Sequence, residues 1–177
     1  MKKFLCLILC VLMACSLLTA CGSKTPESEA ADLNLTDIVA AVEAVAPVAM
    51  AQELSPAIEG SDAFMTDLFG LDLATVEDYY GKTTMVNVSS DVVLAVKAAP
   101  GQIDAVKAAL EARRDAVAAS FEMYLPDQYE KALAGRVVTK GDYALLVIGG
   151  DGQRVVDEGV DAVYAEIDKA IDTALNG

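Results

Sequence analysis

The residues that could carry chemistry are carboxylates, tyrosines and a pair of adjacent arginines, because the chain contains no histidine. Without imidazole, Ser-His-Asp and Cys-His nucleophile systems and His-ligated zinc are excluded, since each needs a group that is neutral and basic near pH 7. The 27 Asp and Glu residues outnumber the 13 Lys and Arg residues, which gives a net charge of −14. This charge argues against a nucleic-acid partner and against a surface that binds anionic lipid.

Arg113 and Arg114 are the cations whose position needs an explanation. Arg114 falls between Leu110 and Val117 on the apolar stripe of a helical pattern. Its stem can lie along apolar surface with the charged head in water, it can pair with a neighbouring acid, or it can help to hold a ligand. The first two are the commoner arrangements. Arg113, Arg114 and Tyr124 are retained as possible ligand contacts.

The acidic residues form no motif for a metal or a cofactor. The chain has no Asp-x-Asp-x-Asp-Gly loop, and its helical acids spread along a face instead of converging. The sequence therefore predicts no metal site and no cofactor. Paired carboxylates could hydrolyse a glycosidic bond, but abundant acids do not establish the required geometry.

Two short strings resemble functional motifs. The segment Gly149–Gly152 lies between a predicted strand and a predicted helix, where backbone N–H groups could hold an anion. It lacks the spacing of a phosphate-binding loop, so we expect a turn in which Asp151 caps the next helix. Residues 87–89 match a glycosylation acceptor, for which a strand end entering a polar turn is the simpler interpretation.

The N-terminus has the layout of an export signal. A cationic start, residues 1–3, precedes an apolar run over residues 4–18. The run is shorter than the ~20 residues that cross a bilayer as a helix. We therefore expect residues 1–20 to be a signal peptide that is removed.

The string Leu18-Thr19-Ala20-Cys21 resembles the lipobox of bacterial lipoproteins. The resemblance implies that Leu18, Thr19 and Ala20 admit the peptidase and that Cys21 becomes the lipidated N-terminus. The alternative is cleavage by ordinary signal peptidase near an unmodified Cys21. Lipidation predicts a protein held on the extracytoplasmic face of the cell membrane by its acyl chains. Residues 21–32, which are polar, small and Pro-containing, then form a flexible tether.

Residues 33–177 are predicted to be a single domain. Helices are expected from a cap at Thr36 and over residues 62–68, 74–80, 102–124, 126–133 and 151–175. Strands are expected over residues 83–88, 92–98, 136–139 and 143–148.

This order predicts an α+β fold made of two ββα units. We expect an antiparallel sheet of about four strands, covered on one face by the two long helices, with short N-terminal helices beside it. No residue-level repeat relates the two units.

Five strings are similar to a family of Gram-positive gut lipoproteins, domain of unknown function 4358. The resemblance covers roughly residues 33–150. It implies export and a similar architecture, and it transfers no catalytic residue. The strings are Leu68–Asp72, Glu77–Tyr79, Met85–Ser89, Val106–Arg113 and Tyr124–Tyr129.

Three functions remain open, each with its own structural signature. A non-enzymatic ligand-binding module needs a concave pocket with a few convergent polar groups. A cell-envelope adaptor needs an exposed apolar patch, and a carboxylate-dependent hydrolase needs two acids in a cleft. The first is the preferred interpretation, with a small ligand or an envelope protein as the unidentified partner.

Overall fold

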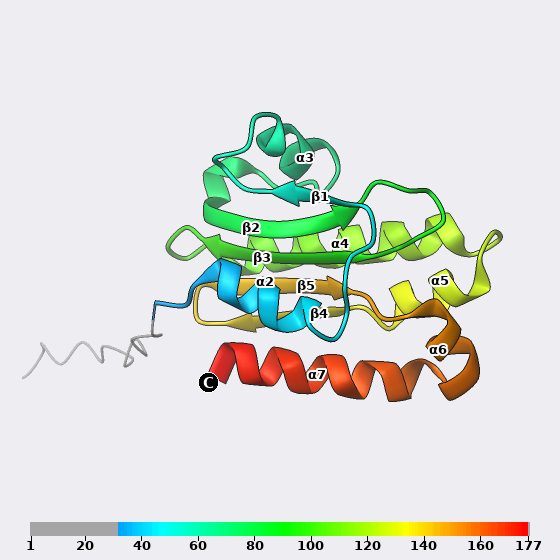
Figure 1. The fold of residues 1–177 in the computed structure, drawn as a ribbon. Coiled ribbons are helices and arrows are strands. Elements are labelled where there is room, and N and C mark those ends of the chain that lie inside the picture. The colour runs from blue at the N-terminus through cyan, green and yellow to red at the C-terminus, as the bar shows by residue number, and fades with distance from the viewer. Residues whose placement is uncertain (1–31, 177) are drawn as a thin grey trace, which may run out of the picture.

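The computed structural model describes residues 32–176 (Figure 1). The predicted signal peptide, the lipobox with Cys21 and nearly all of the predicted tether lie outside the described residues. None of the helices within residues 32–176 is long and apolar enough to cross a membrane.

A five-stranded antiparallel sheet forms the centre of the fold, with strand order β1-β2-β3-β5-β4. The α+β class with an antiparallel sheet is thus confirmed. The sheet has five strands instead of about four because Ala51–Leu54 adds an edge strand, pairing Ala51 with Thr84 and Leu54 with Gly81. The strands are β1 (Ala51–Leu54), β2 (Val76–Thr84), β3 (Val92–Ala98), β4 (Arg136–Lys140) and β5 (Tyr143–Ile148).

One of the predicted helices has the bounds that the sequence indicates. Pro126 begins α5 and Leu133 ends it, as expected from a proline in the first helical turn. The first described helix is capped by Asn34 and not by Thr36, because the Asn34 side chain accepts hydrogen bonds from Thr36 N and Asp37 N. The helices are α2 (Leu35–Glu43), α3 (Ser61–Asp67), the 3₁₀ turn η1 (Leu73–Thr75), α4 (Ile103–Phe121), α5 (Pro126–Leu133), α6 (Gly152–Glu158) and α7 (Val160–Asn176).

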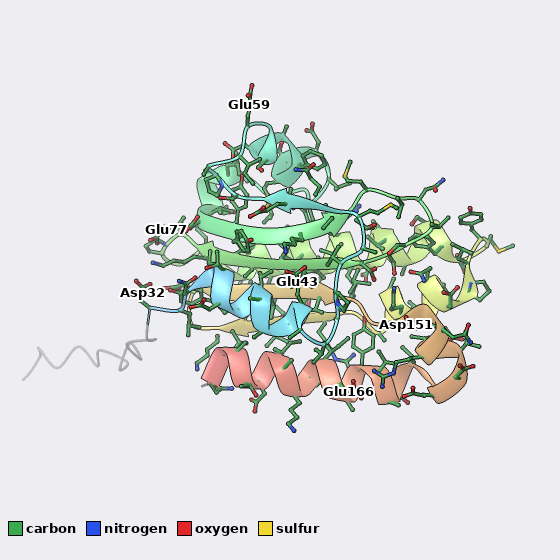
Figure 2. All side chains as sticks on the ribbon, in the orientation of Figure 1. Asp32, Glu43, Glu59, Glu77, Asp151 and Glu166 are labelled. Carbon is green, nitrogen blue, oxygen red and sulfur yellow. The ribbon has the colours of Figure 1, made fainter. Side chains whose placement is uncertain are left out.

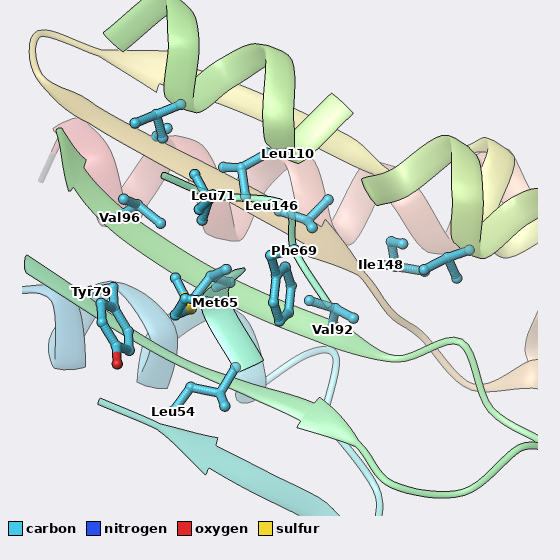
Figure 3. Packing of buried hydrophobic residues seen from close by; sticks show 14 of the residues in the cluster. Leu54, Met65, Phe69, Leu71, Tyr79, Val92, Val96, Leu110, Leu146 and Ile148 are labelled. Carbon is cyan, nitrogen blue, oxygen red and sulfur yellow. The ribbon is translucent and has the colours of Figure 1, made fainter. Parts of the chain in front are cut away.

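Helices cover both faces of the sheet, which corrects the prediction that the two long helices share one face. On β3, Leu94 packs into a cluster with α3 and α4, whereas its neighbour Val93 packs into a second cluster with α2 and α7. Figure 3 shows the first cluster, with Leu110 of α4 close to Leu146 of β5. Since successive side chains of a strand point to opposite faces, α4 and α7 lie on opposite sides of the sheet.

The segment 74–80, predicted as a helix, is a short 3₁₀ turn followed by the start of β2. It is extended because Tyr79 pairs with Val96 of β3, and pairing to a buried neighbour outweighs local helical preference. Gly81 does not end a helix but lies inside β2. A Cβ atom there would approach Val93 O to 2.6 Å, so the close strand contact requires glycine.

The predicted helix over residues 151–175 is divided in two. Gly159, with φ of 88°, separates α6 from α7. A left-handed backbone of this kind cannot continue an α-helix, and glycine adopts it without the steric cost that a side chain would bring.

Different segments of the chain lie at the two ends of the molecule. Asp32, where the described chain begins, lies at one end, and the C-terminus of α7 lies there too (Figures 1 and 2). The segment between β2 and β3, the turn from α4 to α5, and α6 lie at the opposite end (Figure 1).

Candidate functional site

A cavity of about 380 Å³ lies against the second half of α4. Its walls come from α3, from the facing ends of β2 and β3, and from residues 85–91, which connect these strands. Phe64, Leu68, Val117 and Phe121 supply apolar surface to these walls. A hollow of this size, lined by both apolar and polar side chains, is typical of a small-molecule site.

Arg113 is a cation in the cavity wall. Its guanidinium carbon lies 5.4 Å from the centroid of the Phe69 ring, within the range of a cation–π contact. Its Nε atom is buried and has no hydrogen-bond partner. Burial lowers the pKa of the Arg113 guanidinium. The Arg113 guanidinium therefore contacts an aromatic ring, but no carboxylate among the described residues pairs with its charge.

The other cations among residues 32–176 show how unusual this is. Seven of them form salt bridges; Lys140 is hydrogen-bonded to Asn176, and Lys169 is exposed. Arg113 is thus half-buried and unpaired in a strongly acidic protein. An unpaired buried polar group costs free energy, so it needs an explanation beyond folding.

The three residues proposed as ligand contacts do not converge. Arg114 Nε and Nη2 donate to Asp115 Oδ1 at 2.9 and 2.8 Å, which matches the ion-pair alternative. Tyr124 lies beyond the end of α4 with 57% of its surface exposed. Of the three, Arg113 alone lines the cavity. The sequence names both arginines because Arg114 lies on the apolar stripe, and the structure places its neighbour Arg113 at the cavity.

A buried ion pair lies in the cavity wall next to the start of β3. Lys131 Nζ donates to Asp91 Oδ1 at 2.6 Å and to Gly150 O at 3.1 Å, and Lys131 is only 2% exposed. Asp91 lines the cavity, and Lys131 neutralises its charge. Asp91 is therefore not a counter-ion for Arg113.

Hydrogen bonds join this ion pair to neighbouring elements. The backbone N and side-chain Oγ of Ser90 donate to Gln128 Oε1 at 3.0 and 3.1 Å. The Tyr164 hydroxyl donates to Lys131 O at 2.6 Å. The network links residues 89–91 to α5 and α7, and our sequence analysis missed it. A lysine in a short polar helix gives no local sign of burial.

The other sequence motifs have structural explanations. Asp151 accepts from Arg154 N at 3.0 Å and caps α6, as expected. Asn87 lies in the connection between β2 and β3 and lines the cavity. The strand predicted over residues 83–88 is therefore misplaced, because β2 begins at Val76 and ends at Thr84.

A second hollow, of about 490 Å³, lies near Asp32, and its lysine, Lys97, is paired with carboxylates. Lys97 Nζ lies 2.9 Å from Glu77 Oε1 and 3.5 Å from Asp32 Oδ1. The Tyr143 hydroxyl, which donates to Asp32 at 2.8 Å, and then Lys97 lower the pKa of Asp32. This hollow contains no unpaired buried group among the described residues, so the cavity beside α4 is the better candidate.

The chemistry of the candidate site is recognition by charge and shape. Among the described residues that line it, Asp91 is the one carboxylate, and it is paired with Lys131, so the two-acid arrangement of a glycoside hydrolase is not found there. No group of three or more Asp and Glu side chains within residues 32–176 is placed to hold a metal ion.

Fold and site together define an antiparallel α+β domain, covered by helices on both faces, with a cavity beside α4. The chain belongs to the family described as Domain of unknown function (DUF4358), whose model matches residues 50–149. This segment contains all five strands and every residue that lines the cavity. No curated protein and no solved structure matches the chain.

Proposed function

We propose that this protein is a lipid-anchored extracytoplasmic module that binds a small ligand in the cavity beside α4 and does not transform it. The observation that carries the proposal is the unpaired Arg113 guanidinium in a cavity of about 380 Å³. Retaining an unpaired cation there lowers stability. Such a cost is typical of a binding site, where a ligand supplies the missing partner.

The position of the cavity supports the proposed anchoring. Residues 85–91, which form part of its wall, lie at the end of the molecule opposite Asp32 (Figure 1). If Cys21 is lipidated, residues 21–32 connect the membrane to the Asp32 end. The cavity would then lie at the end of the domain remote from the point of attachment, where ligands reach it from solution.

The test is to fill the cavity from α4. Ala116 lines the cavity, and Ala116→Phe would place an aromatic ring in the space that a ligand needs. Ala108→Phe is the matched control, because Ala108 is an exposed residue of the same helix that does not line the cavity. Thermal unfolding of wild type and both variants is measured against a library of small metabolites.

We expect at least one compound to raise the melting temperature of wild type and of Ala108→Phe but not of Ala116→Phe. A ligand at 100 times its Kd stabilises the folded state by about 2.7 kcal/mol, which is readily measured. The proposal fails if no compound stabilises the wild type, or if Ala116→Phe responds as the wild type does.

The adaptor alternative has one observation in its favour. Met123 is 96% exposed, and Tyr124 beside it is also exposed. Apolar side chains at a protruding turn can contact a protein partner. A wild type that no library compound stabilises would favour this alternative.

A further inference from the structure

We propose that the ligand is a monocarboxylate with an apolar body, and that its carboxylate pairs with Arg113. This inference rests on the proposed function, because it names the chemical class that the same cavity would bind. It follows from three features of the cavity: the state of Arg113, the count of charges in the walls and the nature of the remaining surface.

The state of Arg113 points to an anion. Within residues 32–176 this side chain forms no hydrogen bond or salt bridge, and only its Nε atom is shut off from solvent, so the two terminal nitrogens remain accessible. Terminal guanidinium nitrogens match the two oxygens of a carboxylate in a bidentate pair. The Phe69 ring, 5.4 Å from the guanidinium carbon, favours a position of the group over the ring before a ligand binds. Figure 3 shows Phe69 within the core beneath α4.

The charges in the walls point to a single negative charge on the ligand. Arg113 is the one cation among the described residues that line the cavity. The Asp91 carboxylate lies in the same wall, and Lys131, which neutralises it, does not line the cavity. A phosphate or a dicarboxylate would bring a second charge with no cation to meet it. One carboxylate balances one guanidinium.

The remaining surface points to an apolar body. Phe64 of α3 and Leu68, the residue that follows this helix, line the cavity together with Val117 and Phe121 of α4. Ser120, a polar residue of the α4 wall, already donates its hydroxyl hydrogen to Val117 O at 2.7 Å. Burying alkyl or aromatic groups against such walls contributes binding free energy in proportion to the apolar area removed from water.

The experiment compares acids with their uncharged analogues. Isothermal titration calorimetry on the purified protein uses octanoate, phenylpropanoate and indoleacetate, each beside its primary amide, and phenylethylphosphonate as the more highly charged probe. The proteins are wild type, Arg113→Met, Arg113→Lys and the control Arg114→Met, which changes an arginine that is already paired with Asp115.

We expect at least one acid to bind wild type and Arg114→Met at least about tenfold more tightly than its amide and than the phosphonate, a difference of about 1.4 kcal/mol. Arg113→Met should lose this preference and bind acid and amide alike. Arg113→Lys should bind the acid with intermediate affinity, because it keeps the charge but not the bidentate geometry.

Unfolding of the ligand-free variants separates recognition from folding. The melting temperature of Arg113→Met should not fall below that of wild type, since the substitution removes an unpaired charge and keeps an apolar side chain against Phe69. A marked fall would show that Arg113 serves the fold, and it would overturn the inference.

The remaining outcomes distinguish this inference from the proposed function. If an amide or the phosphonate binds as well as the acid, and Ala116→Phe abolishes that binding, the cavity binds ligands but the monocarboxylate class is wrong. If none of the acids binds, the class is again wrong. If, in addition, no library compound stabilises the wild type, the proposed function fails as well.

Discussion

Lys131 shows how a single buried charge organises this fold. Its ammonium group lies between the Asp91 carboxylate, directly before β3, and the Gly150 carbonyl, two residues after β5. The lysine itself belongs to α5, so one side chain connects three separate parts of the chain. Removing one partner of such a pair leaves the other charge buried and unpaired.

Lys131→Met is therefore expected to lower the free energy of unfolding by about 3 to 5 kcal/mol. Adding Asp91→Asn should restore part of this loss, since the variant then buries no carboxylate. Lys107→Met is the control, because Lys107 and Glu111 form a half-exposed pair with an N–O distance of 3.8 Å that is worth less than about 1 kcal/mol. Urea unfolding at pH 7 measures all four proteins. A loss as small as that of the control would contradict the structural role.

At the scale of elements, α6 and α7 are joined across a break. Gly159 interrupts the helical backbone, and Arg154 of α6 bridges the gap. Its guanidinium donates to Glu158 Oε2 at 2.8 Å and to Glu166 Oε1 of α7 at 2.8 Å. Hydrogen bonds from Arg154 lower the pKa of Glu158 and of Glu166. This arginine therefore connects the two helices by ion pairs at their surface.

Arg154→Gln should lower stability at pH 7, and the difference from wild type should disappear in acid. A carboxylate whose pKa is lower in the folded state stabilises the fold above its unfolded pKa, about 4.3 for Glu, and loses this contribution as the pH falls through the folded value. Because the groups are exposed, 1 M NaCl should also remove the difference. Urea unfolding between pH 7 and pH 2 provides the measurement.

Lys169→Gln is the matched control for this prediction. Lys169 is an exposed residue of α7 for which no salt bridge occurs within residues 32–176, so its replacement should leave the pH dependence unchanged. If Arg154→Gln and Lys169→Gln behave alike at every pH, the bridge between α6 and α7 contributes nothing to stability.

At the scale of the whole molecule, the domain is larger than the segment that defines its family. Residues 50–149 contain the sheet, α3, α4 and α5, whereas α2 and α7 lie outside this segment. These two helices cover Val93, Ala95, Leu145 and Val147 on one face of the sheet. Without them that face would be exposed to water, so the folding unit includes both flanking segments.

Cys21→Ala tests how the whole molecule is held. We expect wild-type protein, expressed in a bacterium that processes lipoproteins, to incorporate a labelled fatty acid and to sediment with membranes. Cys21→Ala should incorporate no label and lose its membrane association, because no acyl chain is then attached. Cys15→Ala is the control, since Cys15 lies within the predicted signal peptide and is removed with it. A labelled Cys21→Ala protein, or an unlabelled wild type, would refute lipid anchoring.

Much of the secondary structure was predictable because it follows from local preferences. Pro126 and the helical spacing after it placed α5 correctly, and the β-branched run from Val92 predicted β3. The errors arose where tertiary contacts outweighed those preferences. Tyr79 is extended because β3 pairs with it, and Gly159 breaks a pattern that is otherwise helical.

The sequence contains a pattern that indicates helices on both faces of the sheet, but the prediction placed both long helices on one face. Strands β3 and β5 are continuous apolar runs instead of alternating ones, and their residues are buried almost throughout. Such runs indicate strands covered on both faces, even in an antiparallel sheet. Greater weight on this pattern would have placed the two long helices on opposite sides.

The residues of the candidate site could be predicted only in part from the sequence. Periodicity marks which side of a helix meets the core, and it therefore drew attention to the pair Arg113 and Arg114. Whether Arg113 or Arg114 meets a cavity depends on α3 and on residues 85–91, which reach α4 only in the folded chain. Asp91 and Lys131 are likewise 40 residues apart in sequence. Local patterns report exposure, whereas the partners of a side chain depend on contacts between distant segments.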